Sequence, residues 1–138
     1  MRKNTKFDEL YKILEFKLGA DKARLAMAQI LHETGGKANR LTALNNYSGI
    51  VYVRQDKRFG IVGAKDSGLK QPDGKFNYAQ YDTLDSYVND FLRIVNKSLK
   101  KSETIKDYAL NLKEQKYYGD TVQNYSKGLL HHYLKLKG

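Results

Sequence analysis

One glutamate stands where a proton donor would be useful. Glu33 lies near the end of an apolar, alanine-rich segment, LAMAQILHETGG, whose pattern predicts a helix. Helical steps from Ala26 reach Ile30 and then Glu33, so the carboxyl group shares a face with side chains that we expect to be buried. A desolvated carboxyl group has a raised pKa and keeps its proton near neutral pH, as a general acid must. Gly35 and Gly36 end the helix and leave the side chain beside an open turn. The alternative is an ordinary last-turn glutamate with its carboxylate in water.

A short polar turn, NNYSG, follows at residues 45–49. Asn and Gly tolerate left-handed backbone, and Asn side chains bond to nearby backbone, so this run predicts a tight, self-bonded turn. The same residues also suit sugar binding. Asn45 and Asn46 offer amides to acetamido and hydroxyl groups, and Tyr47 offers a ring for stacking. Both interpretations stay open.

Four segments carry a resemblance to a known family. AQILHETGG followed by NNYSGI resembles the paired signature of the glucosaminidase family of peptidoglycan hydrolases, glycoside hydrolase family 73. FNYAQYDTLDSYVNDFLRIV and KYYGDTVQNYSKGLLHHY resemble two later segments of that family, although the spacing from Tyr118 to Tyr125 is one residue longer. The resemblance covers residues 25–133. It implies one lysozyme-like domain over residues 1–138, α+β and mostly α, with about five helices and a small antiparallel β-lobe flanking a cleft.

The activity that this resemblance implies is that of an endo-β-N-acetylglucosaminidase. Such an enzyme cuts the β-1,4 bond after N-acetylglucosamine in a peptidoglycan glycan strand, here with Glu33 as general acid. The resemblance places Tyr118, or Tyr117 because of the extra residue, near Glu33, where a phenol would position the substrate acetamido group or stabilise positive charge. The further residues that we expect to bind substrate are Gln29, Asn45, Asn46, Tyr47 and Tyr81. No metal or organic cofactor is implied.

The second carboxylate of such an enzyme is not singled out by the sequence. Family members often carry a glutamate in the β-lobe, and residues 50–81 contain none. Asp56, Asp66 and Asp73 are the acids of this segment; Asp66 is our catalytic candidate, and Asp73 belongs to a Pro-Asp-Gly turn. Two routes remain. Either the substrate's own acetamido oxygen attacks, helped by Tyr118, or an aspartate of the lobe activates water.

Apolar stripes at helical spacing predict the elements that position these residues. The predicted helices cover residues 5–18, 22–34, a segment that begins at Asp82 or Thr83, 103–113 and 123–136, and Asp21 is expected to cap the second. IVYVRQ, RFGIVGAKD and KFNYAQY alternate and are rich in Val, Ile, Tyr and Phe, with glycines and a PDG turn between them. They predict two or three short antiparallel strands.

A formal net charge of +10 predicts an anionic partner. The bacterial cell wall and nucleic acid are both candidates, and dispersed lysines also suit a solubilising surface. Because the basic residues are not clustered, we expect the wall and no nucleic acid. Without cysteine there are no disulfides or thiolate metal sites. We expect no membrane span, no signal peptide, and a monomer that reaches the wall from a phage particle, by lysis or through a dedicated machine.

The histidines suggest a metal site as an alternative to proton donation by Glu33. His32 beside Glu33 suggests a zinc motif, but Gly36 occupies the position of the second histidine. His131 and His132 are adjacent on a helix, and we expect them to be surface or packing residues.

A lytic transglycosylase or muramidase on the same fold also uses one glutamate, although the usual Gly-Leu-Met-Gln run of transglycosylases is missing. A cell-wall or nucleic-acid binding protein without catalysis is the alternative from another class.

Overall fold

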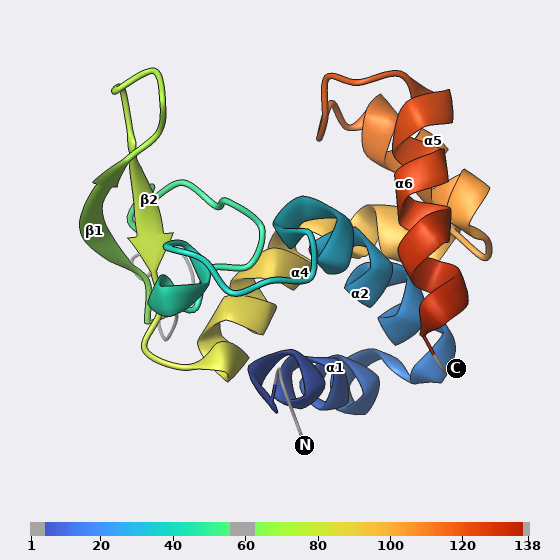
Figure 1. The fold of residues 1–138 in the computed structure, drawn as a ribbon, viewed down its shortest axis with the longest axis horizontal. Coiled ribbons are helices and arrows are strands. Elements are labelled where there is room, and N and C mark those ends of the chain that lie inside the picture. The colour runs from blue at the N-terminus through green and yellow to red at the C-terminus, as the bar shows by residue number, and fades with distance from the viewer. Residues whose placement is uncertain (1–4, 56–62, 137–138) are drawn as a thin grey trace.

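The computed structural model describes residues 5–55 and 63–136. Over these residues the chain is mostly helical, with one small antiparallel sheet, so the predicted α+β class is confirmed. The elements are α1 (Thr5–Leu18), α2 (Ala20–Thr34), the 3-10 helix η1 (Thr42–Leu44), β1 (Lys65–Lys70), β2 (Asn77–Gln80), α4 (Leu84–Lys101), α5 (Ile105–Glu114) and α6 (Val122–Lys135). In Figure 1 the β1–β2 hairpin lies at one end of the molecule and α5 and α6 lie at the other, with α2 between them.

Helix α2 is the central element of the core. It packs against α1, α4 and α6, and residue 23 and residues 25–30 are buried. The alanines among them are small, so neighbouring helices approach closely and surround the segment that leads to Glu33. The buried side chains Phe7, Leu10 and Leu14 of α1 complete this layer.

Glycines mark both ends of α2. Gly35 ends the helix in the left-handed conformation, with φ 70° and ψ 12°, as the sequence predicts. At the other end the predicted cap is wrong. Gly19, with φ 85° and ψ 165°, is the N-cap residue, and Asp21 lies inside the first turn. A carboxylate there still stabilises the helix through its dipole.

Threonine side chains begin the three later helices. Thr83, Thr104 and Thr121 accept hydrogen bonds from the backbone N–H groups of Ser86, Asp107 and Asn124, at 3.0, 3.1 and 3.1 Å. Each such cap contributes about 1 kcal/mol to helix stability. They fix the starts of α4, α5 and α6, and thereby the positions of the side chains that these helices and their connections carry.

The sheet is a single hairpin within the described residues. Strands β1 and β2 pair antiparallel, with Lys65 opposite Gln80 and Lys70 opposite Asn77. The predicted IVYVRQ strand contributes only an isolated bridge, from Val51 to Tyr78. The predicted RFGIVGAKD strand lies partly outside the described residues, and its last two residues begin β1. No described helix is long and apolar enough to span a membrane.

Candidate active site

Glu33 lies in the last turn of α2, next to a tyrosine of α6. The Tyr125 hydroxyl donates a hydrogen bond of 2.9 Å to Glu33 Oε2. The turn itself is held by Thr34, whose hydroxyl donates to the Ile30 carbonyl at 2.9 Å and accepts from the Gly36 N–H at 3.1 Å. The carboxylate is therefore fixed by a phenol on one side and by a closed helix end on the other.

The environment of Glu33 combines access with desolvation. Ala26 and Ile30 on the same helix face are fully buried, whereas Glu33 at the end of that face remains accessible to solvent. Protein atoms still surround its carboxyl group closely enough for desolvation to raise its pKa. The Tyr125 hydrogen bond and the nearby His32 lower this pKa by smaller amounts. A raised pKa with a path to solvent is the combination that a general acid requires.

Two adjacent hollows meet at Glu33. The larger, about 560 Å³, is lined by the loop at residues 48–53, by Arg93 and Ile94 of α4 and by Tyr117 and Tyr118. The smaller, about 200 Å³, is lined by parts of the segment 34–49 and by Tyr78. Glu33, Ser48 and Gly49 border both. We call the larger hollow the cleft. Its volume is in the range of small-molecule sites, and Glu33 is the only ionisable residue that lines both hollows among the described residues.

Phenols surround the carboxylate on its protein side. The negative charge of Glu33 adds to burial in raising the pKa of Tyr87, Tyr108 and Tyr117, and it does the same for Tyr125. These tyrosines therefore stay protonated and act as neutral hydrogen-bonding groups. In the sequence Tyr87, Tyr108 and Tyr125 lie on the apolar stripes of their helices, which predicts core positions and no role at Glu33. The available signal was the use of tyrosine instead of phenylalanine at buried positions of three helices.

Of the two candidate tyrosines before α6, Tyr117 is the one whose phenol interacts with groups around Glu33. The Tyr118 hydroxyl donates to the Ala109 carbonyl at 2.8 Å. Its ring stacks on Tyr125, with centroids 3.7 Å apart and planes 10° apart, so Tyr118 borders the cleft with its ring. The Tyr117 phenol interacts with the side chains of Gln29 and Ser48 and responds to the charge of Glu33. Tyr117 is therefore better placed to hydrogen-bond a ligand.

The Asn-Asn-Tyr turn is closed on itself. Asn45 has φ 58° and donates through Nδ2 to the Tyr81 carbonyl at 3.0 Å. Asn46 is buried, and its Nδ2 donates to the carbonyls of Ile50 and Ala79, both at 2.9 Å. Tyr47 is 2% exposed and packs between the rings of Phe7 and Tyr87. Although Asn46 and Tyr47 border the smaller hollow, these three side chains tie the turn to β2 and the core.

Gln29 and Tyr81 are buried and do not line either hollow. Gln29 Oε1 accepts a hydrogen bond from Tyr108, and its amide lies near the Tyr117 phenol. Gln29 Nε2 does not reach hydrogen-bond geometry with any described group. The Tyr81 hydroxyl donates to Asp90 at 2.5 Å. Gln29 thus lies beside the Tyr117 phenol, and Tyr81 holds Asp90 of α4.

The predicted second carboxylates do not join Glu33 in the described residues. Asp66 is exposed on β1, where the Gly68 N–H, at 3.0 Å, and Asn77 hydrogen-bond to it and hold its pKa below the usual value. Asp73 accepts from the Lys75 N–H at 3.0 Å within the hairpin turn. Asp56 lies outside the described residues. Among the described residues that line the two hollows, Glu33 is the only acid.

An ion pair on α4 was not identified from the sequence. Arg93 lines the cleft, and its Nε lies 2.6 Å from Asp90 Oδ1. Asp90 is fully buried. The only sequence signal was the i, i+3 spacing of an aspartate and an arginine on one helix, which is common on exposed faces and gave no reason to expect burial.

His32 packs α2 against α6, whereas His131 is exposed. His32 meets Tyr125 edge to face, with ring centroids 5.0 Å apart, and lies directly against Gly128 of α6. Desolvation lowers the pKa of His132, with further lowering from His131 and His32. Within residues 5–55 and 63–136, no group of three or more His, Asp or Glu side chains is arranged to hold a metal ion.

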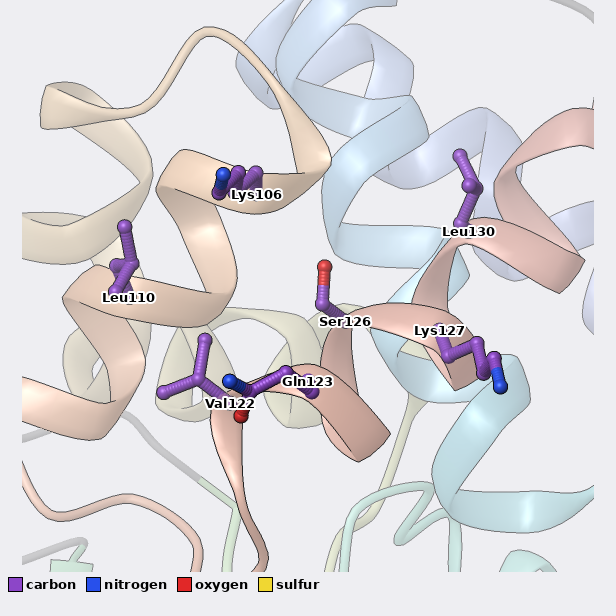
Figure 2. Close-up of a pocket in the computed structure, with 7 residues that line it drawn as sticks. All are labelled: Lys106, Leu110, Val122, Gln123, Ser126, Lys127 and Leu130. Carbon is purple, nitrogen blue, oxygen red and sulfur yellow. The ribbon is translucent and has the colours of Figure 1, made fainter.

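A separate hollow of about 610 Å³ lies between α5 and α6 (Figure 2). Lys106 and Leu110 come from α5, while Val122, Gln123, Ser126, Lys127 and Leu130 come from α6. The described residues that line it include no carboxylate, histidine or tyrosine. Its described lining therefore offers no carboxyl group or imidazole for proton transfer, and the Glu33 cleft remains the candidate for chemistry.

Comparisons of the chain with protein-family models, with curated proteins and with solved structures find no match. The functional assignment therefore rests on the site residues and on the motifs that contain them.

Proposed function

We propose that the protein is a lysozyme-like peptidoglycan hydrolase that cleaves the β-1,4 bond after N-acetylglucosamine. The observation that carries this proposal is the position of Glu33, a carboxyl group with a raised pKa at the junction of two adjoining hollows. An enzyme that cuts within a glycan needs sugar sites on both sides of its acid. The cleft and the smaller hollow supply space for them.

In the first step Glu33 donates its proton to the leaving glycosidic oxygen, and an oxocarbenium-like transition state forms at the anomeric carbon. The substrate's acetamido oxygen then attacks this carbon and water completes the hydrolysis. This route is supported by the absence of a second acid among the described residues that line the hollows. Tyr117 holds the acetamido group in this proposal, because it lines the cleft together with Ser48, with which its phenol interacts. If Asp56 reaches the site, it activates water instead.

The charge of the protein suits the proposed substrate. At +10 the chain is attracted to the carboxylates of the peptide stems and to the anionic polymers of a bacterial wall. This attraction concentrates the enzyme on its substrate and weakens as salt screens it.

The chemistry of the new chain ends tests the proposal. Purified peptidoglycan is digested, the soluble fragments are reduced with borohydride, and their ends are identified by mass spectrometry. We expect reduced N-acetylglucosamine ends. Anhydro sugar ends would instead identify a lytic transglycosylase, and reduced muramic acid ends would identify a muramidase. Wall binding without fragments would support a binding protein.

A further inference from the structure

We propose that Gln29 is a positioning residue, whose side-chain amide turns the hydroxyl proton of Tyr117 toward the cleft, where it binds the acetamido carbonyl oxygen of the substrate. The inference rests on the proposed function, because it names the support of the tyrosine that holds the acetamido group there. It also gives a role to a buried polar side chain that lines neither hollow.

The first observation is how the amide is oriented. Gln29 lies on α2 one turn before Glu33, and its side chain is fully buried. The hydroxyl of Tyr108, from α5, donates a hydrogen bond to Gln29 Oε1. Because Tyr108 is also fully buried, bulk water does not compete for this bond. The bond fixes the amide oxygen on the Tyr108 side, and the NH₂ group occupies the other arm of the planar amide.

The second observation is that this NH₂ group is an unused donor. Gln29 Nε2 is buried and does not reach hydrogen-bond geometry with any described group, which is unusual for a buried amide. The Tyr117 phenol lies near it. Burial and the charge of Glu33 raise the pKa of Tyr117, whereas Gln29 lowers it. Lowering a phenol pKa is the effect of a hydrogen-bond donor, which stabilises the phenolate. The amide nitrogen is therefore the group that faces the phenol oxygen.

The direction of the Tyr117 proton follows from this arrangement. An amide NH₂ group donates hydrogen bonds and does not accept them. Its hydrogens repel the phenol proton from the Gln29 side and leave it the other side, where Tyr117 and Ser48 line the cleft. The Ser48 Oγ already shares a hydrogen bond of 2.7 Å with the Tyr87 hydroxyl. A carbonyl oxygen that enters the cleft thus meets a phenol that is already oriented to donate.

Gln29→Met is the informative variant, because methionine is unbranched and flexible but has no N–H donor. It leaves the Tyr108 hydroxyl buried without its acceptor, which destabilises the protein. The pair Gln29→Met and Tyr108→Phe removes both partners, so it serves where the single variant does not fold. Tyr117→Phe removes the phenolic hydroxyl itself. All variants are made in a Glu33→Gln background, so that hydrolysis plays no part.

Binding of two neutral β-1,4 tetrasaccharides is measured by NMR titration, which also shows whether each variant is folded. Tetra-N-acetylchitotetraose carries an acetamido group at C2 of every sugar, whereas cellotetraose carries a hydroxyl there. In the Glu33→Gln protein we expect tighter binding of the acetamido ligand. With Gln29→Met, alone or paired with Tyr108→Phe, we expect this preference to fall about threefold to tenfold, as the loss of one neutral hydrogen bond implies.

The ratio of the two affinities separates positioning from packing, because a loss of packing weakens both ligands alike. If Gln29 acts through Tyr117, Gln29→Met causes no further fall in a Tyr117→Phe protein. An unchanged preference in both Gln29→Met proteins, or losses that add in the Tyr117→Phe protein, overturn the inference. So does the absence of any preference in the Glu33→Gln protein. Because the readout is binding, failure of the proposed hydrolysis appears separately, as the absence of fragments from the wild-type protein.

Discussion

The hydroxyl of Tyr125 affects how readily Glu33 gives up its proton. A hydrogen bond donated to a carboxylate stabilises the ionised form, so this bond opposes the larger effect of desolvation. Since the proposed acid must be protonated to act, we expect the proposed activity to fall on the alkaline side as Glu33 ionises. The pKa of Glu33 in the free enzyme sets the position of that fall in the pH profile of kcat/KM.

Replacing Tyr125 with Phe should move this alkaline fall to higher pH. The substitution keeps the ring that stacks on Tyr118 and contacts His32, but it removes the bond that lowers the pKa of Glu33. The measurement is the pH dependence of kcat/KM for fragment release. Tyr118→Phe is the matched control, because the hydroxyl of Tyr118 bonds to the Ala109 carbonyl instead of Glu33. A fall that stays in place or moves to lower pH in Tyr125→Phe would contradict this role.

Helices α2 and α6 bring Glu33 and Tyr125 together, and their contact depends on a glycine. A Cβ atom added to Gly128 would lie 2.2 Å from His32 Cε1. Gly128 therefore lets the imidazole ring lie directly against the α6 backbone, one turn after Tyr125. This explains a glycine in the middle of a helix, where it otherwise costs about 1 kcal/mol relative to alanine.

We expect Gly128→Ala to destabilise the protein by about 1–3 kcal/mol, as overpacking does in a close helix contact. The free energy of unfolding is measured by urea denaturation. Gly119→Ala is the control, because nothing lies within 4 Å of its added Cβ atom. Adding His32→Ala to Gly128→Ala should restore part of the loss. A Gly128→Ala protein as stable as the Gly119→Ala protein would show that the helices yield easily at this contact.

The helices were predictable because each depends on local information. Apolar stripes at 3.6-residue spacing and the caps Gly35 and Thr83 identify them within a few residues. The IVYVRQ segment was not predictable in the same way. The Gln55 side chain donates to the Val51 carbonyl at 2.7 Å and accepts from the Val53 N–H at 2.9 Å. These bonds occupy backbone groups that a strand would pair with a neighbour, and alternation of residue types does not reveal them.

The cleft is formed by segments that lie far apart in the sequence. Its described walls come from the end of α2, the loop after it, the middle of α4 and the connection between α5 and α6. The sequence predicted Glu33 from its place on an apolar helix face, and it predicted the Tyr117–Tyr118 pair by resemblance to a family. It could not show that Arg93 and Ser48 border the same space as Glu33, because only the packing of separate elements brings them there. The orientation of each tyrosine hydroxyl also depends on such contacts.

Fragment release by Glu33→Gln is the most direct test of the central claim, that Glu33 is the general acid. Wild type and variant are incubated with purified peptidoglycan, and soluble glycan is quantified. We expect the variant to be about 10²–10⁴-fold slower. We also expect it to unfold at a temperature no lower than wild type at pH 7, because the amide removes a desolvated charge. Equal rates of release from the two proteins would contradict the account.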